Sequence, residues 1–165
     1  MSANKTAEEV AILPYRPNVG LMVLNNEGRV FTGQRLDYPS SAWQMPQGGI
    51  DAGEEEEVAA YRELQEETGI LPEMVKILAR SRSLISYDFP LDVANSLGGR
   101  FKGQQQRWFL MQFSGGDEQV SIQTEVPEFA AWKWMHVNDL LDNIVPFKRA
   151  VYEQVLNEFG DYLDT

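Results

Sequence analysis

The chain has 165 residues, of which 43% are hydrophobic and 24% are charged, and its net charge at pH 7 is −11. This is enough apolar material for one globular domain with a core, and no apolar run approaches the length that spans a bilayer. The absence of cysteine excludes disulfides, zinc–thiolate sites and thiol nucleophiles, and the single histidine, His136, cannot build a histidine metal site. An acidic chain without a Lys/Arg-rich run is not expected to bind a long stretch of nucleic acid backbone.

Composition along the chain predicts one domain between two short tails. Residues 1–14 are expected to form an N-terminal tail with an apolar patch that packs on the surface, residues 15–160 the domain, and residues 161–165 a C-terminal tail. The first ten residues lack the apolar stretch of a signal peptide. Together with the lack of cysteine, this predicts a cytoplasmic protein that does not contact a membrane.

The first fifty residues alternate between β-prone segments and turns. Residues 19–24 are predicted to be a strand, and the turn sequence at 25–28 predicts a hairpin into a second strand at 30–32. Residues 43–45 are expected to form a short strand. Residues 47–49, which include two glycines, are expected to form a flexible loop.

An acidic helix is predicted between Gly53 and Gly69. Acidic side chains near its start suit the positive end of the helix dipole, and glycine commonly ends a helix. Ala60, Tyr61 and Leu64 share a face about a third of a turn from the glutamates. The helix can therefore pack inward while its carboxylates face a cleft.

Further strands are predicted at 76–80, 83–87, 106–113 and 129–135, with a last helix at 146–159. In that helix Phe147, Val151, Val155 and Phe159 follow i, i+4 spacing and form a core face. Interleaved strands and helices combined with hairpin turns predict an α/β fold with a mixed sheet.

Three glutamates of the acidic helix indicate the chemistry. Glu63, Glu66 and Glu67 stand at i, i+3 and i+4, so they share one face and repel one another unless a cation lies between them. Hard divalent ions such as Mg²⁺ take carboxylate oxygens and fill their other positions with water and phosphate oxygens. The spacing therefore predicts a metal-binding helix that serves phosphate chemistry.

The same segment fills the pattern G-x5-E-x7-R-E-U-x-E-E-x-G-U, where U is a bulky apolar residue. The positions that fill it are Gly48, Glu54, Arg62, Glu63, Leu64, Glu66, Glu67, Gly69 and Ile70. In this the chain resembles the Nudix hydrolases. The resemblance implies an α/β/α sandwich in which this segment is a loop–helix–loop, and it implies Mg²⁺, or Mn²⁺ in its place, as cofactor. It also implies that Glu63, Glu67 and the Gly48 carbonyl are metal ligands, that Glu66 is either a metal ligand or a close partner of one, and that Glu54, Arg62 and Gly69 have structural roles.

Segments outside this pattern are similar to one branch of the family. YRPNVG at 15–20, WQMPQGG at 43–49, GQQQRWF at 103–109, PEF at 127–129 and FKR at 147–149 resemble bacterial RNA pyrophosphohydrolases and asymmetric dinucleoside tetraphosphate hydrolases. The resemblance implies that Glu128 joins the metal site. Its implied substrate-binding residues are Arg16, Arg35, Gln104, Phe147 and Lys148. Tyr87 and Phe101 either stack on a second base or pack under a loop.

The sequence thus predicts an enzyme that hydrolyses phosphoanhydride bonds, with Glu63, Glu66, Glu67 and Glu128 as catalytic residues. Its partner is expected to be a 5′-triphosphate RNA end or a dinucleoside polyphosphate such as diadenosine tetraphosphate, and the choice between them stays open here. Which glutamate acts as general base also stays open. Two alternatives are a nucleoside triphosphate pyrophosphatase that sanitises the nucleotide pool and a non-catalytic nucleotide sensor.

Overall fold

The computed structural model describes residues 4–36 and 41–163, so residues 1–3 and 164–165 of the two expected tails lie outside the described residues. Within the described residues seven strands form one sheet. They are β1 (Tyr15–Leu24), β2 (Val30–Arg35), β3 (Gln47–Gly49), β4 (Val75–Arg80), β5 (Ile85–Asp88), β6 (Gly103–Phe113) and β7 (Phe129–Met135). The helices are α1 (Ala7–Ala11), α2 (Glu56–Thr68), α3 (Leu91–Ser96), α4 (Leu140–Asn143) and α5 (Arg149–Glu158).

The sheet is mixed, as predicted. Its main path runs β4-β6-β1-β2-β7, while β3 pairs with β1 and β5 pairs with β6. Strands β1 and β6 are parallel from Tyr15↔Gly103 to Leu24↔Gln112, and the other pairs are antiparallel. This long parallel pair forms the centre of the domain, and β3 brings the loop before α2 against the first half of β1.

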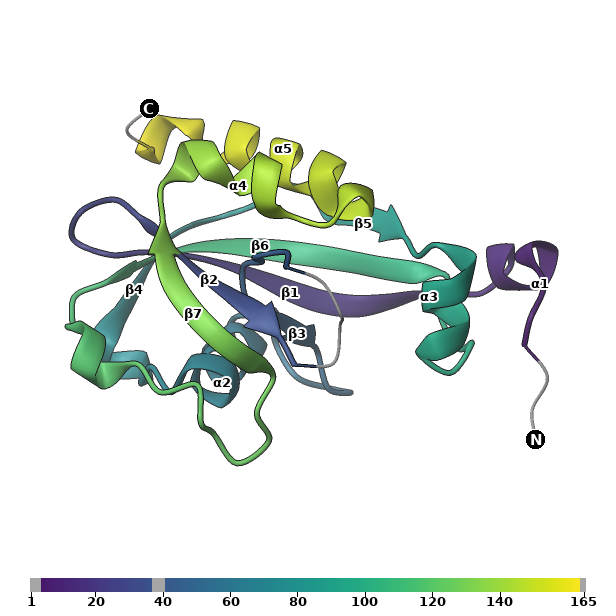
Figure 1. Ribbon diagram of the computed structural model, residues 1–165, viewed down its shortest axis with the longest axis horizontal. Helices are drawn as coiled ribbons and strands as arrows, with labels where there is room; N and C mark the ends of the chain where they lie inside the picture. The colour runs from purple at the N-terminus through teal and green to yellow at the C-terminus, as the bar shows by residue number, and fades with distance from the viewer. Residues whose placement is uncertain (1–3, 37–40, 164–165) are drawn as a thin grey trace.

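Helices cover both faces of the sheet (Figure 1), which gives the expected α/β/α layers. On one face α2 buries Ala59, Ala60 and Leu64 against a core that includes Phe109. On the other face α4 and α5 cover a second core around Trp108. Each layer buries apolar side chains from alternate positions of β1 and β6, because successive residues of a strand point to opposite faces.

Two segments near the acidic helix differ from the prediction. Residues 47–49 are strand β3 and not a flexible loop, because their backbone pairs with β1 through Asn18↔Gly49 and Gly20↔Gln47. Residues 43–45 form only an isolated bridge, Gly33↔Gln44, and not a strand. Glycine lowers strand propensity in general, but here it lets a backbone segment pack closely beside other side chains.

Other differences lie in element boundaries and in one missed helix. Strand β5 covers Ile85–Asp88, two residues later at its start than expected. The last helix begins with a 3₁₀ turn, Pro146–Lys148, before α5. Helix α3, Leu91–Ser96, was not predicted, because a helix of six residues after a proline is too short to show helical periodicity.

Residues 4–14, expected to be part of a tail, contain α1, which packs against α3. Thr6 and Glu9 form a reciprocal capping box at the start of α1. The Asn95 amide of α3 accepts from the Lys5 backbone N–H at 2.8 Å and donates to the Lys5 carbonyl at 3.0 Å. Val10 is buried, whereas Ile12 of the expected apolar patch is exposed. None of the helices in the described part of the chain is long and apolar enough to cross a membrane.

Candidate functional site

The acidic helix is present between Gly53 and Gly69, as predicted: it begins at Glu56, with Glu55 as N-cap, and Gly69 ends it. Before it, Gly53 has a φ of 77°, and a turn links Asp51 and Glu54 through two hydrogen bonds. At its end Gly69 has a φ of 74° and donates its N–H to the Gln65 carbonyl. A side chain at Gly69 would also collide with the Ser121 backbone, so this position is restricted to glycine.

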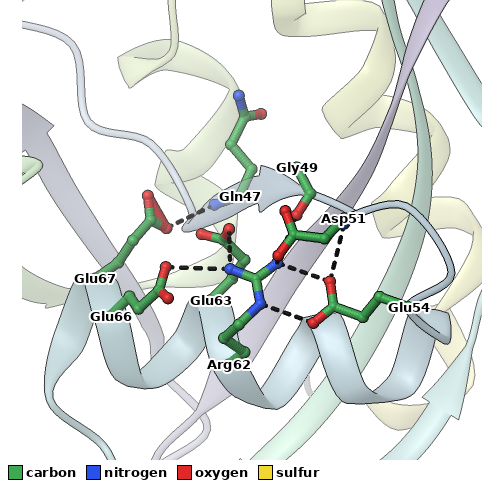
Figure 2. A network of polar contacts seen from close by, with 8 residues as sticks. All are labelled: Gln47, Gly49, Asp51, Glu54, Arg62, Glu63, Glu66 and Glu67. Atoms are coloured by element: carbon green, nitrogen blue, oxygen red, sulfur yellow. Dashed lines mark hydrogen bonds and ion pairs between the residues drawn. The ribbon is translucent and has the colours of Figure 1, made fainter.

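Arg62 is the centre of a network that joins the loop to the helix (Figure 2). Its guanidinium binds Glu54 through two hydrogen bonds, from Nε at 2.7 Å and from Nη2 at 2.8 Å. Nη2 also donates to the Gly49 carbonyl at 2.8 Å. Nη1 donates to Glu63 at 2.8 Å and to Glu66 at 3.2 Å. The expected Arg62–Glu54 ion pair is therefore present, and the same guanidinium orients two further carboxylates and one carbonyl.

This network shifts the ionisation of its members. The hydrogen bonds from Arg62, with a backbone hydrogen bond at Asp51, lower the pKa of Glu54 to about 2. The contacts with Glu54 and Glu63 raise the pKa of Arg62 above its already high value. Glu54 thus stays ionised over the whole neutral range and holds Arg62 in place.

The glutamates of α2 differ in environment. Glu67 is only 3% exposed, and one of its oxygens accepts the Gln47 backbone N–H at 3.0 Å. Burial, then the nearby charges of Glu63 and Glu128, raise the pKa of Glu67 well above its ordinary value. Burial also raises the pKa of Glu63, and Arg62 opposes that shift. Glu66 is exposed. The buried carboxylates therefore repel one another in a place where a cation would stabilise their charged forms.

Gly48 lies against this cluster. A Cβ atom on Gly48 would overlap the carboxyl group of Glu63, and one on Gly49 would overlap the guanidinium of Arg16. Both glycines therefore serve close approach and not an unusual backbone angle. Their lack of side chains lets the β3 backbone lie directly beside an acidic and a basic group.

Glu128 comes from the loop before β7, far from α2 in sequence. Its carboxylate is 3.4 Å from Nη2 of Arg35 on β2, and its backbone carbonyl accepts the Leu36 N–H at 3.0 Å. The charge of Glu128 acts on Glu67, so the loop residue and the helix residue lie in one electrostatic site. Glu128 and Glu67 also line the same cleft.

One cleft of about 490 Å³ brings the expected residues together. Every residue expected to hold metal or substrate lines it, namely Arg16, Arg35, Gly48, Glu63, Glu66, Glu67, Gln104, Glu128, Phe147 and Lys148. The three residues expected to have structural roles, Glu54, Arg62 and Gly69, are not among its lining residues. Helix α2 lies on the opposite side of the sheet from α5 (Figure 1). The cleft is lined both by glutamates of α2 and by Phe147 and Lys148, which lie in the 3₁₀ turn before α5.

The far part of the cleft is aromatic and carries one buried cation. The Lys148 ammonium lies 5.6 Å from the centre of the Tyr87 ring and donates to the Gln44 side-chain oxygen at 3.4 Å. The Phe147 ring lies 6.1 Å from the Tyr87 ring. Burial raises the pKa of Tyr87 to about 12, and its ring is only 7% exposed. Tyr87 is therefore a packed wall residue, and Phe101 is not among the residues that line the cleft.

Several lining residues were not predicted. Asn18, Gln44 and Gln47 line the cleft from β1, the bridge and β3, and Val93, Ser96 and Leu97 line it from the α3 region. Amides give no charge signal in a sequence, so only their position in YRPNVG and WQMPQGG pointed to them. The α3 residues gave none, because the helix itself was not expected.

Within the described residues, no three Asp, Glu, His or Cys side chains are arranged so that they could hold a metal ion. The reason is visible in Figure 2: Glu63 and Glu66 are turned to Arg62, and Glu67 to the Gln47 backbone. The donor set still fits a hard divalent ion, because it consists of carboxylates and carbonyls and because burial, followed by the neighbouring acids, raises the pKa of Glu67.

Comparisons with known proteins agree with the geometry. A model of the NUDIX domain matches residues 14–155 of the chain. The chain is 52% identical to an RNA pyrophosphohydrolase of Roseobacter denitrificans over 159 residues, which are 96% of this chain and 99% of that protein. It is 54% identical to an RNA pyrophosphohydrolase of Sphingopyxis alaskensis over 149 residues, which are 90% of this chain and 94% of that protein.

Solved structures show the same fold at lower identity. A C. elegans Ap4A hydrolase binary complex superposes with a TM-score of 0.64 at 22% identity and covers 88% of this chain and 96% of its own. The E. coli dihydroneopterin triphosphate pyrophosphohydrolase superposes with a TM-score of 0.67 at 21% identity and covers 87% of this chain and 99% of its own. At such identities the likeness concerns the fold.

Proposed function

Because this chain belongs to the Nudix family, we propose that it is a pyrophosphohydrolase that acts on the 5′-triphosphate end of RNA. The observation that supports this most is that carboxylates of α2 and Glu128 line the same cleft as three cationic side chains, Arg16, Arg35 and Lys148. Roughly half identity to RNA pyrophosphohydrolases over nearly the whole chain supports the choice of substrate.

In the proposed reaction a water molecule attacks a phosphorus atom of the triphosphate. The bond between that phosphorus and the bridging oxygen breaks, pyrophosphate leaves, and the RNA keeps a 5′-monophosphate. The water loses a proton to a glutamate of the cleft, and the negative charge on the phosphoryl oxygens must be neutralised. Among the candidate bases, Glu67 interacts electrostatically with both Glu63 and Glu128.

Nudix hydrolases generally use divalent metal ions, and for this chain we propose Mg²⁺, which Mn²⁺ can replace. Glu63, Glu66, Glu67, Glu128 and the Gly48 carbonyl would hold it. When bound, the ion supplies Lewis-acid polarisation of phosphate oxygens and a water of lowered pKa. Arg62 and Glu54 would position the ligands from behind, since both lie outside the cleft lining.

The remaining cleft residues would bind and orient the substrate. Arg16 and Arg35 present guanidinium groups, which match phosphate geometry, beside the carboxylates. Lys148 would bind a phosphate as a point charge, and Phe147 beside it offers an aromatic face for a base. Gln104 would hydrogen-bond to the substrate from the central strand β6.

A dinucleoside polyphosphate such as diadenosine tetraphosphate is the second candidate substrate. It would be cleaved to a nucleoside triphosphate and a nucleoside monophosphate. The net charge of −11 favours a small substrate over a long RNA, because it repels a polynucleotide backbone. RNA would therefore be held by its 5′ end alone, without an extended binding surface. Either substrate is consistent with a cytoplasmic enzyme, which cell fractionation can test.

The deciding experiment compares three substrates at equal concentration in Mg²⁺: 5′-triphosphate RNA, diadenosine tetraphosphate and free nucleoside triphosphates. We expect the highest kcat/KM for triphosphate RNA, with pyrophosphate and 5′-monophosphate RNA as products. Preference for diadenosine tetraphosphate would favour the second candidate, and preference for free triphosphates would favour a nucleotide-pool enzyme. Binding without cleavage of any of them would indicate a nucleotide sensor, although a sensor is expected to lack these carboxylates.

A further inference from the structure

The floor of the cleft is built from polar residues at alternate positions of the two central strands. In the parallel β1–β6 register, Arg16 lies opposite Gln104 and Asn18 opposite Gln106. Residues two apart on a strand point to the same face, so these four side chains face the same side of the sheet. Asn18 is 1% exposed and Gln106 is fully buried, yet Asn18 lines the cleft.

A donor-only group at the base of this floor determines how its amides are turned. The indole Nε1 of Trp108 donates to the Gln106 side-chain oxygen at 3.0 Å. An indole N–H cannot accept a hydrogen bond, so Gln106 must turn its oxygen towards Trp108 and its NH₂ group away. That NH₂ group donates to the Asn18 side-chain oxygen at 2.8 Å and to the Gln47 side-chain oxygen at 3.0 Å.

Asn18 is therefore held with its side-chain oxygen towards Gln106 and its NH₂ group towards the cleft. Its Nδ2 atom is buried and has no hydrogen-bond partner within the described residues. A buried donor without a partner is destabilising, and most such groups in native proteins are explained by a ligand, a water or an ion. The close packing of the indole over Gly20, where a Cβ would overlap the ring, keeps Trp108 in the position that sets this orientation.

We propose that Asn18 is a substrate-binding residue whose amide N–H donates to a phosphoryl oxygen, and that Trp108 and Gln106 are positioning residues that keep this donor turned into the cleft. The inference rests on the proposed function, since it assumes a polyphosphate in the cleft. It adds a neutral donor to the charged groups that bind phosphate. The donor is oriented by a buried chain of hydrogen bonds from Trp108 through Gln106 to Asn18, which we call the relay.

The position of Asn18 favours a phosphoryl oxygen as the acceptor. Asn18 pairs with Gly49 across β1 and β3, and the guanidinium of Arg16 lies against Gly49 on the same face of the sheet. Arg16, two residues earlier on the same face, acts on the charge of Glu63. Because Arg16 also acts on the charge of Tyr87, the donor lies between the acidic residues and the aromatic residues of the cleft. An ionised phosphate offers only acceptors, which matches an amide that presents only its N–H groups.

The relay can be reversed without touching Asn18. In Gln106→Glu the carboxylate still accepts from Trp108 but cannot donate, so Asn18 must turn its NH₂ group to residue 106 and its oxygen to the cleft. Asn18→Asp keeps the oxygen that accepts from Gln106 and replaces the donor by a negative charge. The matched control is Gln112→Glu on the same strand, because the Gln112 amide donates to the Leu24 and Phe113 carbonyls and does not line the cleft.

The probe is adenosine 5′-(α,β-methylene)triphosphate, with Mg²⁺, measured by calorimetry, alongside KM and kcat for triphosphate RNA. We expect the Kd and KM to rise at least about tenfold in Gln106→Glu and Asn18→Asp, which corresponds to one lost hydrogen bond to a charged acceptor. In Gln112→Glu both constants should change less than about twofold. Thermal unfolding checks that each variant is folded. In the wild-type protein the side-chain amide NMR signals of Asn18 should shift on addition of the probe, and this measurement needs no variant.

Unchanged Asn18 amide signals, with wild-type Kd and KM in folded Gln106→Glu, would overturn the inference and indicate that the amide meets an internal water only. The proposed function would then still stand if triphosphate RNA is cleaved. Conversely, shifted signals and weakened probe binding in a protein that cleaves no polyphosphate would support the role of Asn18 in binding and overturn the proposed function.

Discussion

The backbone of Gly48 lies directly against the carboxyl group of Glu63, with no room between them for a methyl group. Gly48→Ala should therefore displace Glu63 from the metal-binding end of the cleft. We expect kcat to fall at least about 100-fold, since small displacements of catalytic groups have effects of this size. Gly160→Ala is the matched control, because a Cβ there meets nothing within 4 Å. Wild-type turnover of Gly48→Ala would contradict a role for this contact in activity.

Glu67→Gln should abolish hydrolysis yet stabilise the metal-free protein. The pKa of Glu67 is raised by burial and by neighbouring acids, so its charge is tolerated less in the folded than in the unfolded state. The stability that the protonated form provides is full below the ordinary pKa and is lost as the pH rises through the raised value. The advantage of the variant, measured as its Tm minus that of the wild type, should thus grow with pH. A Tm difference that shrinks with rising pH would contradict this.

Mg²⁺ should stabilise the wild-type protein against heat, since it binds the folded carboxylate cluster. At a concentration ten times its Kd the gain is about 1.4 kcal/mol. In the Glu67→Gln variant Mg²⁺ should raise the Tm much less. The matched control is Glu8→Gln, which changes an exposed acid on α1 that does not line the cleft, and there Mg²⁺ should act as in the wild type. An equal effect of Mg²⁺ on all three proteins would place the metal elsewhere.

Glu54→Gln should weaken the support of the metal ligands and change the acid stability. Because Arg62 lowers the pKa of Glu54 to about 2, the stabilising charge is present above the ordinary pKa and is lost as the pH falls towards 2. The variant should therefore unfold at a lower temperature at pH 7, and the difference from the wild type should vanish at about pH 2. Thermal unfolding across this range tests the sign, and a difference that persists at low pH would refute it.

Arg35 and Glu128 should separate substrate binding from chemistry. Their ion pair is 3.4 Å long, with side chains 25% and 38% exposed, so it contributes little to stability, at most about 1 kcal/mol. We expect Arg35→Ala to raise KM for triphosphate RNA roughly tenfold or more. Glu128→Gln should mainly lower kcat, by about 10- to 1,000-fold. Steady-state kinetics on both variants, with Tm as the folding control, decides this. If Glu128→Gln raised KM as much as Arg35→Ala and left kcat unchanged, Glu128 would be a binding residue.

The acidic helix illustrates what the sequence determines locally. The glycine that ends the helix, the apolar face with Leu64 and the glutamates at i, i+3 and i+4 are short-range features, and the helix lies in the segment that they predict. The pairing of Arg62 with Glu54 is likewise local, since Glu54 lies only eight residues before Arg62. Such features follow from spacing and helix geometry alone.

Features that depend on pairing between distant segments were harder to predict. Residues 47–49 look like a loop because two of them are glycines, and only the neighbouring strand β1 makes them a strand. The orientation of Asn18 depends on Trp108, ninety residues further along the chain, through a buried amide between them. Neither could follow from local propensity, because the partner decides the outcome.

The docking of α1 on α3 through Asn95 has a practical consequence for anyone who produces this protein. The inner side of the α3 region, with Val93 and Leu97, forms part of the cleft wall. Removing the first eleven residues would remove the α1 helix that packs against α3, and a bulky affinity tag fused close before them would strain this contact. Kinetics from shortened or tagged preparations would then describe a different rim from that of the intact chain, so a C-terminal tag is the safer choice.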